Sequence, residues 1–256
     1  MNFFSRRTAL AAISALALAA CGNGDSAGNG PVIADTGELG HVKGAADAPV
    51  TLIEYASPTC PACKYWHDEI QPEIVRDYVD TGKVKFVFRE FPLHQPDVPA
   101  YLVAMCAGED KYFDVMAELF EYQSGIVDAA RNGVLKPALM TIAERNGIVG
   151  EAAFDACMNN RELREHMADI VQTGEKFRVS GTPTFVVDGR KHEFAEMNTL
   201  GVVKSVLDAA LEAKGVEAPA ADAATTEETT DIPEGSSLET EGESADAPAE
   251  SENAGE

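Results

Sequence analysis

The chain has 256 residues, of which 45% are hydrophobic and 25% charged, proportions typical of a protein with a packed core. This length suits one domain with extensions rather than two full domains. The sequence holds 43 acidic against 20 basic residues, a formal net charge of −23, and no cluster of Lys or Arg. Because a nucleic-acid-binding face must replace the counterions of the phosphates with basic side chains, this composition argues against DNA or RNA as a partner.

The first 20 residues have the pattern of an export signal. Arg6 and Arg7 precede an apolar run over residues 9–20, in which Ser14 is the one polar residue. The run is too short to cross the hydrocarbon core of a bilayer, which takes about 20 residues. A positive start followed by a short apolar segment is typical of a signal peptide, here residues 1–20, that directs the chain to the periplasm. The pair of arginines leaves both the general and the twin-arginine export routes open.

The apolar run ends in Leu18-Ala19-Ala20-Cys21, which resembles the lipobox of bacterial lipoproteins. The resemblance implies that Cys21 is lipidated and anchors the mature chain to a membrane. Gly22 follows it in place of the Asp associated with inner-membrane retention, which favours the outer membrane. An ordinary cleavage site at Ala17-Leu18-Ala19 is the alternative. Lipidation is preferred because five cysteines are an odd number, and an unpaired exported thiol needs an explanation.

Two polar segments flank the part of the chain that can fold. Residues 21–40 are rich in Gly, Asn and Ser, which predicts a flexible tether. Residues 216–256 predict a disordered acidic tail, because from residue 217 onward they carry 13 acidic residues, no basic one and few apolar side chains to offset the entropy of ordering. The folded domain is therefore expected over residues 41–215.

A strand, a helix and a second strand are predicted in the first part of this domain. Residues 50–56 form a short apolar run with β-branched members, which suits a strand buried on both faces. Apolar residues four apart from Trp66 to Tyr78 then indicate a helix. Alternating large apolar residues over 84–88 indicate the second strand. A strand–helix–strand unit of about 40 residues predicts a parallel pair with a right-handed crossover.

The rest of the domain is predicted to be helical and then to return to strands. Between about residues 97 and 178, Gly, Asn and Pro separate helical patterns. Five helices are expected there, over 98–108, 112–122, 136–147, 150–158 and 162–177. A strand at 184–187, a turn at Asp188-Gly189 and a short partner strand at 191–194 follow. An apolar stripe from Leu200 to Leu211 predicts a last helix.

Cys60-Pro61-Ala62-Cys63 lies where the first strand leads into its helix. Cysteines three positions apart on a first helical turn can close a disulfide, and the first sulfur faces the unpaired N–H groups at the positive end of the helix dipole. These groups favour the thiolate, which is the species that attacks disulfides. Half of a zinc site and an inert bridge are the alternatives, but Cys106 and Cys157 are too distant in sequence to complete a zinc site. We expect a redox-active pair that needs neither metal nor cofactor.

The CxxC at a strand–helix junction, the helical block inserted after the second strand, and Gly181-Thr182-Pro183-Thr184 before the third strand together resemble the DsbA family. Members of this family are thioredoxin-fold proteins that introduce disulfides into exported proteins. The resemblance covers residues 41–215 and implies an α/β thioredoxin fold with an inserted all-helical subdomain at about residues 97–178. It also implies that Pro183 follows a cis peptide bond beside the CxxC, and that the backbone of Thr182 binds an extended substrate segment.

Glu54 lies six residues before Cys60, as does the buried acid of thioredoxin-like proteins. It shares a strand face with Leu52 and Ala56, so we expect burial to raise its pKa and to let it exchange a proton with the Cys63 thiol. A solvent-facing acid is the alternative. The sequence departs from strongly oxidising members of the family, which often carry His between the cysteines, and this departure predicts a weaker oxidant.

Cys106 and Cys157 fall on two different predicted helices of the inserted block. In an oxidising compartment they can pair as a structural disulfide, and two buried free thiols are the alternative. The five histidines have no metal-ligand spacing, and solvated or capping roles are expected for each.

These features predict a membrane-tethered, exported thiol–disulfide oxidoreductase of the DsbA type, in which Cys60 attacks and Cys63 resolves the mixed disulfide. The expected substrates are reduced or unfolded exported proteins, and the resemblance implies a quinone-linked membrane partner that re-oxidises the enzyme. A monomer is expected. An isomerase is the less favoured alternative, because isomerases of this fold usually carry a dimerisation domain that residues 21–40 are too few to form. A reductase or isomerase, and a peptide-binding chaperone whose CxxC is structural, remain open as alternatives.

Overall fold

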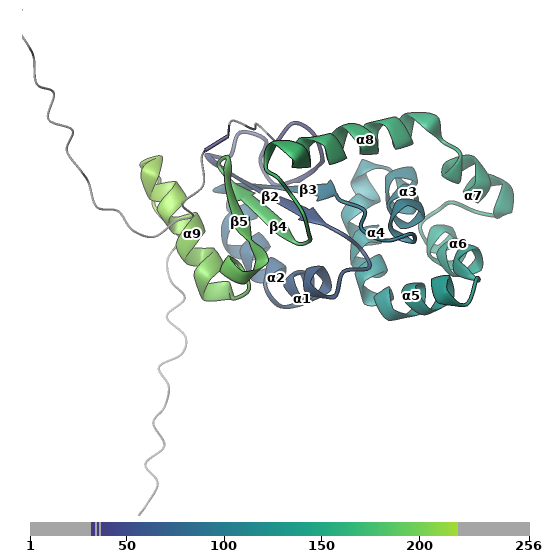
Figure 1. The fold of residues 1–256 in the computed structure, drawn as a ribbon. Coiled ribbons are helices and arrows are strands. Elements are labelled where there is room, and N and C mark those ends of the chain that lie inside the picture. Colours follow the sequence, from purple (N-terminus) through teal and green to yellow (C-terminus); the bar gives the residue numbers. More distant parts are fainter. Residues whose placement is uncertain (1–31, 34, 36, 220–256) are drawn as a thin grey trace, which may run out of the picture. The chain divides into compact units, whose positions relative to one another are not determined.

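A computed structural model describes residues 32–33, 35 and 37–219 of the chain (Figure 1). The predicted signal peptide, Cys21, most of the predicted tether and nearly all of the predicted acidic tail lie outside these residues. Within the described part, no helix is both long enough and apolar enough to cross a bilayer.

A five-stranded mixed sheet with the strand order β1-β3-β2-β4-β5 forms the centre of the fold. Its strands are β1 (His41–Lys43), β2 (Val50–Ala56), β3 (Val84–Glu90), β4 (Thr184–Val187) and β5 (Arg190–Glu193). The predicted parallel pairing of β2 and β3 is confirmed, whereas the other neighbouring strands are antiparallel. β1 is absent from the sequence-based expectations because three residues are too few to show an alternating pattern.

The central strands are buried on both faces, which explains their nearly continuous apolar sequence. Leu52 of β2 belongs to the main core, together with Trp66 of the first helix, while the next residue, Ile53, belongs to a second cluster on the other face with Phe177. Trp66 is fully buried and its ring packs against Phe185 of β4, with the ring centroids 4.8 Å apart. These contacts place the start of the first helix directly on the sheet.

The helix predicted from Trp66 to Tyr78 is interrupted at Ile70, between α1 (Pro61–Glu69) and α2 (Gln71–Ile74). Pro72 has no N–H to donate to the carbonyl four residues earlier, so the helical hydrogen-bond ladder cannot run through it. A π-helical turn (Val75–Val79) follows α2. The last helix, α9 (Leu200–Ala213), contacts α2, β2 and β4.

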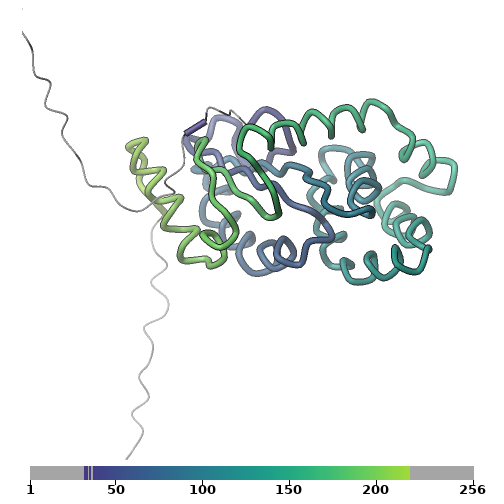
Figure 2. Tube along the Cα trace, in the orientation of Figure 1, coloured from purple at the N-terminus to yellow at the C-terminus, as the bar shows by residue number. Residues whose placement is uncertain are grey.

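Six helices, one more than expected, lie between β3 and β4: α3 (Asp97–Ala107), α4 (Glu109–Glu121), α5 (Gln123–Arg131), α6 (Leu135–Arg145), α7 (Glu151–Met158) and α8 (Arg161–Lys176). The additional helix is α5, whose buried apolar residues are Ile126 and Ala129, too few to give a helical pattern in the sequence. A disulfide between Cys106 of α3 and Cys157 of α7 joins two of the inserted helices. Figure 2 shows the chain leaving the sheet after β3 and returning to it along α8.

The residues just before β1 pack onto the sheet rather than continuing the predicted tether. The N–H of Ile33 donates to the carbonyl of Gly189 at 2.8 Å. Asp35 forms an ion pair with Arg89 of β3 at 2.8 Å, and the Arg89 guanidinium also donates to the carbonyl of Leu39 at 2.8 Å. Arg89 is 1% exposed and its charge needs these partners. Among the described residues, contacts with the sheet are thus present ahead of residue 41, at Ile33 and Asp35.

His41 is buried at the junction between the sheet and the inserted helices, where a solvated or capping role was expected. Its Nε2 lies 2.7 Å from Oε1 of Glu90, and its Nδ1 lies 3.1 Å from Oε2 of Glu109, the first residue of α4. Its ring stacks on Tyr112, whose hydroxyl donates to Glu90 at 2.8 Å. His192 of β5 is buried as well. The expectation was wrong for both residues, because a histidine beside a sheet can be enclosed without any signal in the sequence.

Candidate active site

The loop between β2 and α1 turns the end of a strand into the start of a helix. Cys60 is the N-cap of α1, with φ −85° and ψ 119°, and its sulfur accepts a hydrogen bond from the N–H of Cys63 at 3.4 Å. Pro61 occupies the first helical turn, where its missing N–H leaves no carbonyl unpaired. The sequence of the motif thus places one sulfur at the positive end of a helix.

The two cysteines of this turn have opposite environments. Cys60 keeps 7% of its surface exposed, and Cys63 keeps none. The hydrogen bond from the Cys63 thiol is the largest influence on Cys60; burial opposes it, and the N–H groups of Cys63 and Ala62 reinforce it, so that the pKa of Cys60 falls to about 6. Burial raises the pKa of Cys63 well above its ordinary value, and the hydrogen bond to Cys60 and the charge of Glu54 act in the same direction. At neutral pH the first sulfur is therefore a thiolate and the second a thiol.

Glu54 lies on β2 between Phe88 of β3 and Phe185 of β4, and it is 2% exposed. Burial raises the pKa of its carboxyl well above the ordinary value, and the charge of Cys60 acts in the same direction. The charge of this carboxyl in turn acts on Cys63 and raises the pKa of that thiol. The burial of Glu54 favours its protonated form.

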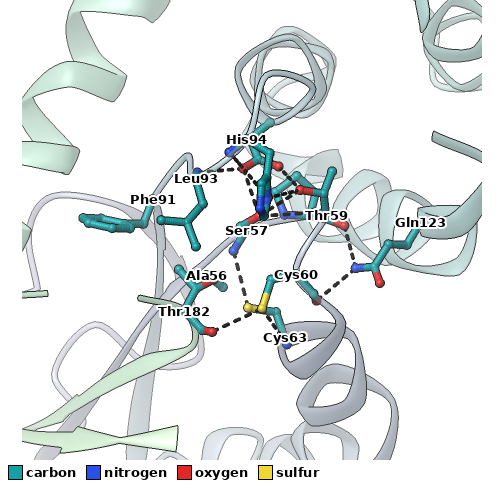
Figure 3. A network of polar contacts seen from close by, with 12 residues as sticks. Ala56, Ser57, Thr59, Cys60, Cys63, Phe91, Leu93, His94, Gln123 and Thr182 are labelled. Carbon is teal, nitrogen blue, oxygen red and sulfur yellow. Dashed lines mark hydrogen bonds and ion pairs between the residues drawn. The ribbon is translucent and has the colours of Figure 1, made fainter. Parts of the chain in front are cut away.

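The chain segment before β4 closes the site on the side of the sheet (Figure 3). The peptide bond between Thr182 and Pro183 is cis. The sulfur of Cys60 lies 3.2 Å from the carbonyl oxygen of Thr182, to which a protonated thiol donates. The structure therefore brings Cys60 against Thr182, which lies 122 positions further along the chain, while Glu54 lies on β2, the strand that leads into the motif.

The inserted helices close the site on the opposite side. Asp97 of α3 is fully buried and accepts hydrogen bonds from the hydroxyls of Ser57 and Thr59, at 3.0 and 2.6 Å. Gln123 of α5 donates its amide to the carbonyls of Pro58 and Cys60 at 2.8 and 3.0 Å. Sequence reasoning missed these residues. The acid that begins a helix and the amide in an unrecognised helix belong to no motif, so an alignment of relatives would be needed to find them.

A pocket of about 580 Å³ opens beside the motif, against Thr59 and Pro61. Its far wall is formed by α5, including Val127 and Ala130, and its third side by the loop before α3, including His94. The pocket is mostly apolar and lies across the Cys60 loop from Thr182 (Figure 3). It provides room for a side chain of a molecule bound at Cys60.

The remaining predicted site residues lie elsewhere. Cys106 and Cys157 form their disulfide within the insertion, with Cα atoms 6.1 Å apart. Cys21 lies outside the described residues. In the ranges that the structure describes, Cys60 and Cys63 are the cysteines that form no disulfide. No group of three or more His, Cys, Asp or Glu side chains in those ranges is arranged to hold a metal ion.

Comparison with known families matches residues 36–209 to the family model described as Thioredoxin. The chain belongs to the thioredoxin family. A thioredoxin-family relative from Rickettsia bellii, named "Putative protein-disulfide oxidoreductase", is 29% identical over 174 residues. The alignment covers 67% of this chain and 64% of the relative, so the chain spans less than two thirds of that protein's length.

Two solved structures share the arrangement of this thioredoxin-family chain. Wolbachia pipientis alpha-DsbA1 superposes with a TM-score of 0.56 and 23% identity, covering 68% of this chain and 93% of the other. BdbD from Bacillus subtilis, in its oxidised form, superposes with a TM-score of 0.58 and 25% identity, covering 67% and 92%. The predicted DsbA-like thioredoxin fold with an inserted helical subdomain is confirmed.

Proposed function

We propose that the protein is an exported thiol–disulfide oxidoreductase that introduces disulfides into substrate proteins. The observation that carries the proposal is the contrast between Cys60, a partly exposed sulfur with a pKa of about 6, and Cys63, a fully buried thiol three residues away. A thiol of low pKa is a good leaving group, so a mixed disulfide at Cys60 breaks readily in favour of the substrate. This property favours a donor of disulfides.

The reaction begins from the form in which a disulfide joins Cys60 and Cys63. A substrate thiolate attacks the sulfur of Cys60, the enzyme disulfide breaks, and the electron pair leaves on Cys63. Glu54, whose burial favours the protonated form, gives its proton to the Cys63 sulfur. A second substrate thiolate then attacks the substrate sulfur of the mixed disulfide, and Cys60 leaves as a thiolate. Two electrons pass from the substrate dithiol to the cysteine pair.

Substrate binding is proposed on both sides of Cys60. The backbone of Thr182, ahead of the cis bond to Pro183, would pair with an extended substrate segment in the manner of strand addition. The apolar pocket beside Thr59 would receive a neighbouring side chain of the same segment. Both features suit an unfolded polypeptide rather than a small polar molecule.

The proposed setting follows from the sequence. The signal over residues 1–20 would deliver the protein to the periplasm, and lipidation of Cys21 would hold it at a membrane, with the outer membrane favoured. A quinone-linked membrane partner would re-oxidise the cysteine pair, and the monomer would act on reduced exported proteins. Incorporation of a labelled fatty acid that is lost in Cys21→Ser would support the anchor.

The test is the oxidation of a reduced, unfolded protein in a glutathione buffer that contains catalytic amounts of the enzyme. Faster disulfide formation supports the proposal. Binding of the unfolded protein without any acceleration would indicate a chaperone with a structural CxxC. The absence of His between the cysteines favours a reductase or isomerase as the second candidate, so the equilibrium potential of the Cys60–Cys63 pair against glutathione is measured in parallel. A potential well below that of glutathione would contradict the assignment as an oxidant.

A further inference from the structure

Each residue from 56 to 60 is hydrogen-bonded to a side chain of the helical insertion. Three side chains are responsible: Tyr101 bonds the carbonyl of residue 56, Asp97 the hydroxyls of residues 57 and 59, and Gln123 the carbonyls of residues 58 and 60. The loop that carries the reactive sulfur therefore depends on the insertion for its conformation (Figure 3).

Asp97 is the anchor on one side of the loop. Besides the two hydroxyls, its carboxylate accepts the N–H groups of Leu93 and His94, both at 2.8 Å. A buried carboxylate is costly unless hydrogen bonds satisfy it, and here four donors do so. A carboxylate held by four donors is a rigid attachment point for Ser57 and Thr59.

Ser57 links Asp97 to both cysteines by hydrogen bonds. Its N–H donates to the sulfur of Cys63 at 3.5 Å, and its carbonyl accepts the N–H of Cys60 at 3.1 Å. Its hydroxyl, bonded to Asp97, also accepts the N–H of Thr59 at 3.2 Å. A shift of Ser57 would move the donor to Cys63 and the backbone of Cys60 together.

Gln123 holds the loop from the other side. It is 7% exposed, and the carbonyl of Cys60 that it bonds also accepts the N–H of Lys64, the first hydrogen bond of α1. The amide therefore fixes the peptide at which the helix begins. This peptide sets the direction in which the Cys60 sulfur leaves the backbone.

We propose that Asp97 and Gln123 are positioning residues, through which the helical insertion holds the Cys60 sulfur at the N-terminus of α1 and thereby sets the reactivity of the cysteine pair. The inference rests on the proposed function, because it assigns the insertion a part in the same exchange chemistry. It differs from a purely structural role, which would change the stability of the protein and leave the sulfur unaffected.

The test uses two variants that remove a hydrogen bond without changing any charge. Gln123→Met keeps the length of the side chain and loses both donors, and Thr59→Val keeps the shape and loses the bond to Asp97. Because a loosened helix start weakens the N–H contacts with the thiolate, each should raise the pKa of Cys60 by roughly half a unit or more. The pKa is followed by the ultraviolet absorbance of the thiolate, with Cys60→Ser as the blank.

Thr173→Val is the matched control. Thr173 also belongs to the insertion and is buried, but its hydroxyl bonds Tyr55 on the other face of the sheet, at 2.8 Å. It should lower the melting temperature and leave the Cys60 pKa unchanged. If the control shifts this pKa equally, or if neither Gln123→Met nor Thr59→Val shifts it, the positioning role is wrong. Should one of these two variants fail to fold, the other decides.

The measurement separates this inference from the proposed function. The thiolate titration needs no substrate, so a pKa shift in the variants of a wild type that oxidises nothing would support positioning and contradict the proposed activity. If the wild type is active but its variants keep the Cys60 pKa and the equilibrium constant with glutathione, the proposed activity is supported and the positioning role is contradicted.

Discussion

The described part of the protein contains two cysteine pairs that differ in their spacing and in the polar groups around their sulfurs. Cys60 and Cys63 are three residues apart, form no disulfide, and lie at a helix start among polar groups. Cys106 and Cys157 are separated by 51 positions and form a disulfide between two helices of an apolar insertion. Under the proposed function, sulfur serves reversible exchange in the first pair and a permanent link in the second. The difference comes from the groups around the sulfur: helix N–H donors, a buried acid and a polar loop.

The strongest test of this contrast is to remove one sulfur from the first pair. Cys60→Ser eliminates the sulfur that the substrate thiolate attacks and that leaves in the second exchange, so the oxidation of a reduced substrate should fall to the rate of the glutathione buffer alone. Cys106→Ala/Cys157→Ala, which removes the other pair, should retain the wild-type rate. Substantial oxidation by Cys60→Ser would show that the reaction does not pass through this sulfur.

The next largest effect is on the exchange rate, and it concerns Glu54, the buried acid near the first pair. Glu54→Gln cannot give a proton to Cys63, so we expect exchange to slow by roughly 10²-fold and its pH dependence to flatten. Glu69→Gln, on the exposed side of α1, is the control.

The same substitution has a predictable effect on stability. Because the pKa of Glu54 is higher in the folded than in the unfolded chain, its favourable contribution is complete below pH 4.5 and is lost as the pH rises through the folded value. Glu54→Gln should therefore become more stable than the wild type toward alkaline pH, as measured by urea unfolding. In the kinetic test, an exchange rate and pH profile of Glu54→Gln equal to those of the wild type would rule out the proton-transfer role of Glu54.

Removal of the second pair should change stability rather than rate. Without the cross-link between α3 and α7, Cys106→Ala/Cys157→Ala should lose about 2–4 kcal/mol in the free energy of unfolding, since a long loop is freed in the unfolded chain. Denaturant unfolding of the oxidised wild type and the double variant measures the difference. Equal stability with altered oxidation kinetics would indicate that this disulfide takes part in the exchange.

The smallest effect is on the pH dependence of stability, and it is expected at His41, where the sheet meets the insertion that holds the second pair. Burial disfavours the charged form of His41, but Glu90 and Glu109 outweigh it and raise its pKa. A raised folded pKa gives a contribution to stability that is complete below pH 6.5 and is lost as the pH rises through the folded value. The wild type should therefore lose more stability than His41→Gln over that window. Parallel curves for the two proteins would show that His41 is not charged in the fold.

Much of the fold could be predicted from the sequence, because the spacing of apolar residues indicates which side of a strand or helix is buried. The parallel strands follow from runs such as that at residues 50–56, and the position of Glu54 on a buried face follows from the same alternation. The CxxC motif is informative because few arrangements require two cysteines at that spacing before a helix.

The contacts around the motif could not be predicted, because they depend on polar side chains that no period places. Asp97 resembles an ordinary acid at a helix start, and Gln123 lies on a helix with few buried apolar residues. Arg89 alternates with apolar neighbours as an exposed residue would, yet the chain before β1 covers it. Such contacts join residues distant in sequence and become visible only in three dimensions.

The ion pair between Asp35 and Arg89 has a practical consequence for the choice of recombinant fragments. A truncation that starts at His41, at the first strand, would remove the only carboxylate paired with Arg89 in the described part of the chain, the Leu39 carbonyl that accepts from its guanidinium, and residues that cover its side chain. The domain would lose these contacts and the packing on the stem of Arg89. Shortened forms intended for crystallisation or kinetics should therefore start upstream of Ile33.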